Sequence, residues 1–272
     1  MQTTHYNKPG LFYILSTLMP WSFWFLAAYI SHLHEGYENQ ASIIAFLGLL
    51  FPALVVFAMT YQDQSIVNDI KKRLLFSKTV KAKFIIIGCI LMPCSILLAQ
   101  AISILFGYST AQFQLSGQFS FSSGVFPVWF MLVVAPILEE LAWHSYGTDC
   151  LRNRFNLFHT SMFFAFYWGI WHFPLSFING YYHSNLAEDG IIYSINFAVS
   201  LIPFVIIMNW IYYKTGRNIL ITIIFHITAG LFNEMFQTHP MSKVIQTGLL
   251  LILCAYLLLS EKEFFFNKKV KR

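Results

Sequence analysis

The chain contains few charged residues. Asp, Glu, Lys and Arg make up 11% of its 272 residues, whereas soluble domains average about 25%. So few charges cannot cover a water-exposed surface, which excludes an ordinary soluble domain. Hydrophobic residues make up 57% of the chain and aromatic residues 18%. This composition predicts a protein with several membrane-spanning segments.

Cysteine is scarce as well. The four cysteines, Cys89, Cys94, Cys150 and Cys254, lack paired ligand spacing, so we predict no disulfide framework. No small-residue cleavage site follows the apolar run 11–30, so we interpret this run as a membrane helix rather than a signal peptide. The net charge of +5 comes from residues in short loops, and we predict no nucleic-acid partner.

Long apolar segments recur along the chain. About 20 apolar residues span a bilayer as a helix, and backbone groups in lipid must be satisfied within the segment. We therefore predict an all-α, polytopic membrane protein that forms a single membrane domain over residues 1–272. We see no internal repeat or low-complexity tract. The eight predicted spans are 11–31, 42–62, 84–107, 125–148, 159–180, 191–213, 218–237 and 242–260.

The loop charges predict the orientation of these spans. Basic residues gather in the even-numbered loops, at 71–83, 152–154 and 214–217, and in the tail 261–272. The odd-numbered loops carry acids such as Glu188. Lys and Arg favour the cytoplasmic side of a membrane. We therefore expect both termini, including the basic tail, to be cytoplasmic.

Two adjacent carboxylates lie deep inside the fourth predicted span. A charged side chain at the bilayer centre costs at least about 2.5–3.5 kcal/mol, so such residues are functional candidates. At about 1.5 Å per residue, Glu139, His172 and His226 lie about 14, 20 and 12 Å from the cytoplasmic ends of their helices. Within boundary error, three helices can therefore bring these side chains to one level.

Helix geometry predicts different roles for the two acids. Adjacent residues point about 100° apart around a helix, whereas residues four apart share a face. Glu140 therefore faces with His144, and Glu139 faces with Trp143. We expect one acid to act on a substrate while a neighbour holds the other.

The residues alone leave alternatives open. His172 could be a satisfied hydrogen-bonding residue between helices. Trp168 and Trp171 fit simple packing or an interfacial position. Intramembrane acids and histidines also serve as proton relays in transporters. On this basis a hydrolase and a proton-coupled transporter remain equally open.

Three sequence motifs favour a hydrolase over a transporter. They are APILEELAWHSYG at 135–147, FYWGIWHFPLSF at 166–177 and YYKTGRNILITIIFHITAGLFNE at 212–234. Together they resemble the EExxxR, FxxxH-type and HxxxN-type motifs of the CPBP family, which contains CAAX proteases and bacteriocin-processing (Abi) proteins. The resemblance covers about 127–234, and we expect a catalytic core at 125–237.

The resemblance implies a membrane-embedded endopeptidase, in an archaeal or bacterial cell membrane. From the depths of Glu139, His172 and His226 we expect a cavity open toward the cytoplasm. Its partners would be the lipid bilayer and a membrane-associated protein or peptide, of CAAX type, a bacteriocin or a signalling peptide. By motif, Glu139 would activate the attacking water with help from His172. His226 would help to bind the oxyanion, a standard electrostatic contribution to hydrolysis.

A metal-dependent mechanism is the alternative. The family carries a metalloprotease name, and Glu139, His172 and His226 would form a known type of catalytic zinc set. The chain contains no HExxH motif, and a glutamate-activated water fits the family members seen as metal-free. We therefore favour no cofactor.

Two positions depart from the family motifs. His144 stands where the family has Arg, and Gly230 stands where it has Asn. Loss of an oxyanion donor can lower a rate by about 10²–10³. Asn233, seven residues after His226, could replace the missing amide if the helix is distorted at Gly230. These departures keep open an inactive relative that acts in bacteriocin immunity or as an interaction protein. A small transporter is a third possibility, although no inverted repeat supports it.

Overall fold

A computed structural model describes residues 6–34, 36–76 and 80–268. Residues 77–79 of the second loop and 269–272 of the basic tail lie outside the described residues. Within the described residues the chain forms helices, with one isolated β-bridge between Leu115 and Phe236. The predicted all-α class is confirmed. The helices are α1 Pro9–Ser31, α2 Glu38–Thr60, α3 Gln64–Arg73, α4 Ala82–Ile104, η1 Thr110–Phe113, α5 Val128–Ala142, η2 Trp143–Gly147, α6 Thr148–Arg152, α7 Leu157–Trp171, η3 Phe173–Phe177, α8 Tyr182–Asp189, α9 Ile191–Lys214, α10 Ile219–Met235, α11 Pro240–Ser260 and α12 Lys262–Phe266.

Six helical segments of the described chain are long and apolar enough to cross a membrane. They are α1, α2, α4, the continuous segment from α5 to α6, α9 and α11. The chain is therefore a polytopic membrane protein. The other two predicted spans are shorter, because α7 has 15 residues and α10 has 17. The count of eight crossings and the cytoplasmic termini remain predictions.

The fifth predicted span ends earlier than expected. We predicted one helix over 159–180, but α7 ends at Trp171 and a 3₁₀ helix follows. Pro174 explains the break, because proline disfavours helical conformation in the preceding residue and lacks an N–H for the helix ladder. As a result His172 lies at the C-terminal cap of α7 rather than in the middle of a helix.

The fourth span changes its helical form directly after the two carboxylates. Residues Trp143–Gly147 form a π-helical turn, η2, between α5 and α6. Such turns occur mostly as single-turn bulges and are frequent at functional sites. Gly147 allows this turn to pack closely on α1, since a Cβ there would lie 2.6 Å from the Phe12 ring.

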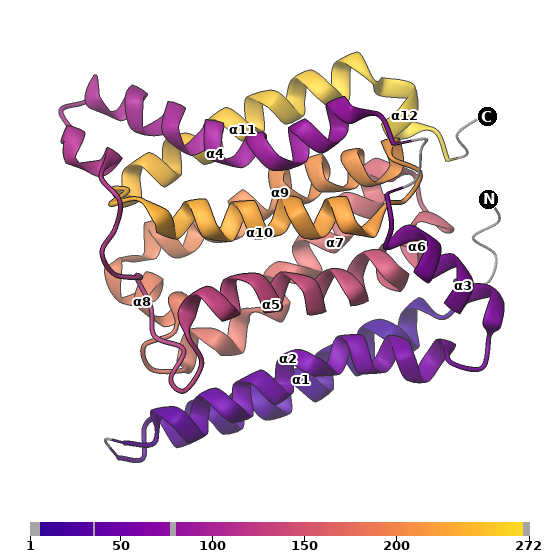
Figure 1. Cartoon of the computed structure of the whole chain (residues 1–272), viewed down its shortest axis with the longest axis horizontal. Helices are drawn as coiled ribbons and strands as arrows, with labels where there is room; N and C mark the ends of the chain where they lie inside the picture. Colours follow the sequence, from indigo (N-terminus) through magenta and orange to yellow (C-terminus); the bar gives the residue numbers. More distant parts are fainter. Residues whose placement is uncertain (1–5, 35, 77–79, 269–272) are drawn as a thin grey trace.

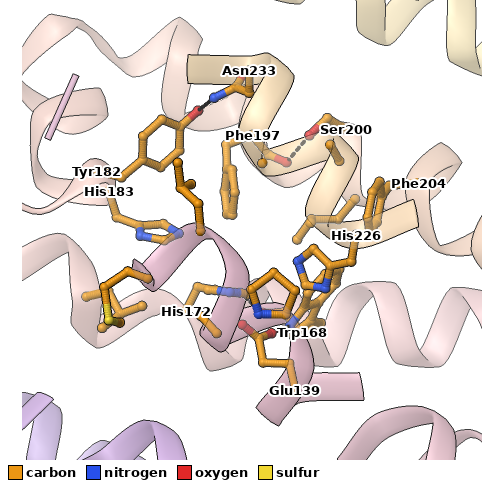
Figure 2. A pocket seen from close by; sticks show the side chains of 18 of the residues that line it. Glu139, Trp168, His172, Tyr182, His183, Phe197, Ser200, Phe204, His226 and Asn233 are labelled. Atoms are coloured by element: carbon orange, nitrogen blue, oxygen red, sulfur yellow. Dashed lines mark hydrogen bonds between the residues drawn. The ribbon is translucent and has the colours of Figure 1, made fainter. Parts of the chain in front are cut away.

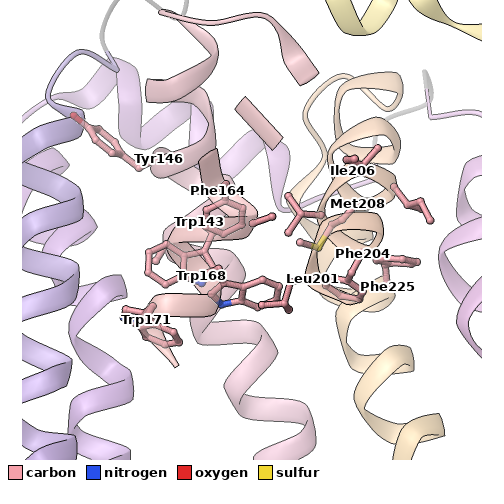
Figure 3. Packing of buried hydrophobic residues seen from close by; sticks show 14 of the residues in the cluster. Trp143, Tyr146, Phe164, Trp168, Trp171, Leu201, Phe204, Ile206, Met208 and Phe225 are labelled. Carbon is pink, nitrogen blue, oxygen red and sulfur yellow. The ribbon is translucent and has the colours of Figure 1, made fainter. Parts of the chain in front are cut away.

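Figure 1 shows how the long helices pack together. The α1–α2 pair lies along α5 on one side of the molecule, and the α4–α11 pair lies on the other side. Helices α9 and α10 lie between α5 and the α4–α11 pair. Large aromatic side chains fill the interior, including Trp143, Phe164, Trp168 and Trp171 (Figure 3). The Trp143 and Trp171 ring centroids are 5.2 Å apart. Two of these rings, Trp143 and Trp168, contact Glu139.

The two ends of the molecule differ in charge. The segments α3, α6 and α12 lie together at one end, and α8 lies at the opposite end (Figure 1). We call these the basic end and the α8 end, because the basic loops fall with the first group and Glu188 and Asp189 belong to α8. The helix order therefore places the basic loops on one side, as the charge pattern predicts.

Candidate active site

The predicted catalytic residues line one cavity. Glu139 from α5, His172 at the cap of α7 and His226 from α10 border a space of about 340 Å³ (Figure 2). The remaining lining is largely apolar and comes from all the long helices. It includes Trp24, Phe46, Leu49, Met92, Met131, Leu132, Trp168, Phe197, Leu201, Phe204 and Leu250.

The cavity extends from Glu139 toward the α8 end. Its outer lining includes Phe121, Tyr182, Asn233 and Glu234, whereas α3 and α6 contribute no residue to it. We expected a cavity open toward the basic, predicted cytoplasmic end. The residues that line it instead lie between Glu139 and the α8 end, and the buried Arg73 at the basic end is not among them.

Glu139 has one oxygen held and one directed to the cavity. The side chain is 6% exposed. Its Oε2 accepts hydrogen bonds from Trp168 Nε1 at 2.8 Å and Trp143 Nε1 at 3.4 Å. Among the described residues, Oε1 has no protein donor, so it is available to a water molecule or a substrate. The predicted position of Glu139 beside Trp143 is seen in the structure.

His172 is oriented by the backbone of its own helix. Its Nδ1 lies 2.7 Å from the carbonyl oxygen of Trp168, so Nδ1 carries the proton that it donates. The other nitrogen, Nε2, is then an acceptor in the neutral ring. Trp168 therefore contacts both Glu139, through its indole, and His172, through its carbonyl.

Glu140 does not line the cavity but connects two histidines. The residue is fully buried. Its Oε1 lies 3.0 Å from His226 Nδ1, and its Oε2 is bonded to His144 Nδ1. The predicted pairing of Glu140 with His144 is present. Because a carboxylate accepts hydrogen bonds, the bond to Oε1 also orients the His226 ring, with Nε2 on the side away from Glu140.

The two departures from the family motifs have different surroundings. Gly230 lines the cavity one helical turn beyond His226, and a Cβ there would make an ordinary contact with Leu132 at 3.5 Å. Asn233 lies further toward the α8 end. Its amide donates to Tyr182 Oη at 3.4 Å (Figure 2). It also donates to Glu234 Oε1 at 3.0 Å. The Asn233 amide is thus engaged away from the three predicted catalytic residues.

The sequence reading did not identify His183. This residue lies at the start of α8, and its ring stacks on His172 with centroids 5.0 Å apart. Its buried Nε2 has no hydrogen-bond partner among the described residues. Burial lowers the pKa of His183 to about 4, so a neutral imidazole stacks on His172 at neutral pH. No motif pointed to this residue, since α8 follows the break at Pro174.

The cluster of buried charges at the basic end was also missed. Arg73 and Arg217 were expected to be loop charges, yet they are 4% and 7% exposed. Arg217 Nε lies 3.1 and 3.0 Å from the two Asp149 oxygens. Burial acts to lower the pKa of the Arg217 guanidinium, but the contact with Asp149 outweighs burial and raises it. The cluster therefore stays charged.

The zinc alternative is not supported by the side-chain positions. In residues 6–34, 36–76 and 80–268, no three His, Cys, Asp or Glu side chains are grouped closely enough to hold a metal ion. Both Glu139 Oε2 contacts are to indole N–H donors.

Comparisons with known proteins support the relationship that the motifs suggest. Residues 121–232 match the family model described as type II CAAX prenyl endopeptidase Rce1-like. A protein from Methanococcus maripaludis named CAAX prenyl protease 2 is 35% identical over 272 residues, which covers 98% of this chain and 99% of that protein. With these matches over a polytopic helical structure, the chain belongs to the Rce1-like CAAX prenyl endopeptidase family of integral membrane proteins.

Proposed function

We propose that the chain hydrolyses a peptide bond of a membrane-associated protein or peptide with a water molecule activated by Glu139, without a metal. The main supporting observation is the geometry of Glu139. One oxygen is held by two indole donors, and the other is available in the cavity beside His172. A carboxylate in such surroundings has a fixed direction for proton transfer.

The proposed reaction uses three side chains in sequence. Glu139 takes a proton from water as the water oxygen attacks the scissile carbonyl carbon, and His172 Nε2 helps to orient that water. The carbonyl oxygen becomes negatively charged and receives a hydrogen bond from protonated His226 Nε2. The C–N bond then breaks, and protonated Glu139 returns its proton to the leaving amine. The products are a carboxylate and an amine.

For the substrate we propose a protein or peptide with a prenylated CAAX C-terminus. The name of the relative and the description of the family model support this class. The apolar lining from Phe46, Leu49 and Met92 supports it independently, because an isoprenoid chain would lie against such side chains.

Purified protein in detergent or liposomes can test the substrate. A farnesylated CAAX peptide should release its last three residues as a free peptide, detected by mass spectrometry, whereas the same peptide without the prenyl group should be cleaved far more slowly. Equal cleavage of both peptides would contradict the prenyl assignment. Cleavage by Glu139→Gln at the rate of wild type would contradict the mechanism. Glu38→Gln, a change at an exposed acid, is the matched control.

A further inference from the structure

A chain of buried polar groups extends from the proposed site into the middle of the helices. It runs from His226 through Glu140 and His144 to Asn209 on α9 and Ser161 on α7. Glu140, His144, Asn209 and Ser161 are all buried. A fully satisfied buried network of this kind is expected to fix the orientation and protonation of its members.

The direction of each hydrogen bond can be assigned from the Ser161 end. Ser161 Oγ donates to the Leu157 carbonyl at 2.9 Å, which uses its single proton. Ser161 therefore accepts from Asn209 Nδ2, also at 2.9 Å. This places Asn209 Oδ1, an acceptor, 2.9 Å from His144 Nε2. His144 Nε2 must then carry a proton.

The opposite side of the His144 ring also faces an acceptor. Nδ1 is bonded to Glu140 Oε2, while the other Glu140 oxygen accepts from His226. With an amide oxygen at Nε2 and a carboxylate at Nδ1, both ring nitrogens donate. A histidine that donates from both nitrogens is an imidazolium cation.

We propose that Asn209, oriented by Ser161, is a positioning residue that holds His144 as an imidazolium, so that His144 gives Glu140 a fixed positive partner. This proposal rests on the proposed function, because Glu140 in turn orients His226 at the cavity. His144 thereby takes the place of an arginine, which carries a permanent charge. A histidine needs an acceptor at each ring nitrogen to stay charged, and the Asn209 amide supplies one of them, whereas an arginine is charged without such help.

The other groups around His144 are compatible with a positive ring. Glu140 faces it from α5, and the Tyr212 ring from α9 lies 4.7 Å from its centroid. Arg73 from α3 donates to the His144 carbonyl oxygen at 3.0 Å and pairs with Asp149 of α6 at 3.1 Å. From α7, Ser161 and the Phe164 ring are near, and neither is ionised at neutral pH.

The experiment compares pH–rate profiles of wild type, Asn209→Leu and Asn209→Asp. Asn209→Leu removes the acceptor, so its kcat should fall about tenfold or more at alkaline pH with little change in KM, and should recover toward wild type in acid. Asn209→Asp keeps an acceptor and should stay active to higher pH than Asn209→Leu. Ser161→Ala should change the pH–rate profile in the same direction. This variant tests the proposal if Asn209→Leu does not fold.

Ser103→Ala, in a buried polar cluster with Gln112 far from the site, is the control and should keep the wild-type profile. A loss of kcat in Asn209→Leu that is equal at every pH would overturn the proposal, since purely structural damage gives that result. Imidazole ¹⁵N NMR of the protein, assigned with His144→Gln, should show both nitrogens of His144 protonated. A neutral His144 in wild type would also overturn the proposal, even if no substrate is cleaved.

Discussion

At the residue scale, Trp168 connects the two groups that are proposed to handle the attacking water. Its indole holds Glu139 and its carbonyl holds His172, at 2.8 and 2.7 Å. Tryptophan suits this position because its large apolar ring excludes water while its single N–H points at one acceptor. The ring also lies edge-on to His226, at 5.3 Å between centroids. One side chain thus contacts all three predicted catalytic residues.

Gly230 gives the first prediction. The family motif has Asn at this position, and the space around Gly230 admits a side chain with only an ordinary contact to Leu132. Gly230→Asn should place a second donor near the proposed oxyanion and raise kcat by about 10- to 100-fold, somewhat less than the effect of removing such a donor from an optimised site. Steady-state cleavage of the prenylated peptide by wild type and Gly230→Asn measures the change in kcat.

Gly230→Ala is the matched control, since it fills the same space without an amide and should leave kcat near wild type. An equal gain in both variants would mean that helix rigidity rather than the amide is responsible. No gain in Gly230→Asn would argue that His226 alone stabilises the oxyanion.

The roles of some site residues could be predicted from the sequence, and those of others could not. The division between Glu139 and Glu140 follows from the 100° step of a helix, and the structure places Glu139 at the cavity and Glu140 behind it. Trp168 looked like ordinary packing, because spacing cannot show where an indole N–H points. His183 could not be predicted, since its position depends on a break and turn far from any motif.

At the scale of elements, the π-helical turn η2 joins the site to the basic end. Arg73 donates to the carbonyl oxygens of His144 and Ser145 at 3.0 and 2.8 Å, which are backbone acceptors within the turn. It also contacts Asp149 at 3.1 Å. A π turn leaves carbonyls that need partners outside the regular helix ladder. Arg73 from α3 supplies them.

Removing this guanidinium should therefore destabilise the fold. Arg73→Met keeps an apolar stem but leaves buried acceptors and weakens the pairing of Asp149, so the free energy of unfolding should fall by about 3–5 kcal/mol. Arg73→Lys should lie between Met and wild type, because an ammonium cannot reach as many acceptors. Thermal unfolding of the detergent-solubilised protein measures both.

Lys72→Met is the control for this experiment, since Lys72 is the exposed neighbour of Arg73 on α3. It should leave the unfolding temperature unchanged. If Arg73→Met unfolds at the same temperature as Lys72→Met, the cluster does not hold the π turn. Sequence alone could not identify this role, because Arg73 stands beside exposed lysines and its burial depends on residues distant in the sequence, such as Tyr6, Asp149 and Tyr212.

At the scale of the whole molecule, the cavity and the charge pattern point in opposite directions. The cavity extends to the α8 end, whereas the positive-inside rule predicts that the basic end faces the cytoplasm. If both hold, a substrate reaches Glu139 from the outer side or through the lipid-facing side of the helices. The orientation of the chain in the membrane therefore determines how the site is reached.

Cysteine labelling can determine this orientation. In a background with Cys89 and Cys94 replaced by serine, Glu188→Cys and Lys72→Cys place a thiol at the α8 end and the basic end. A membrane-impermeant maleimide should label Glu188→Cys in intact cells and Lys72→Cys only after the membrane is opened. The reverse pattern would show that the loops do not follow the charge rule and that the cavity faces the cytoplasm.

The broad architecture was the part most accessible to sequence. Long apolar segments must be helices in lipid, so the all-α polytopic class followed from composition and length. The length of α7 could not be predicted in the same way, because the apolar run continues past the break at Pro174. The length of α10 could not be predicted either, because its apolar residues continue into the part of the helix that lines the cavity. The direction of the cavity also could not be predicted from the sequence, since it depends on how side chains from all the long helices pack around Glu139.

The central claim is that Glu139 activates the water without a metal. The most direct measurement is kcat for cleavage of the prenylated peptide by wild type and Glu139→Gln, each with and without 1,10-phenanthroline. We predict that Glu139→Gln lowers kcat by about 10²–10⁴-fold and that the chelator leaves wild-type kcat unchanged. Full activity of Glu139→Gln, or loss of wild-type activity to the chelator with recovery on adding zinc, would contradict the account.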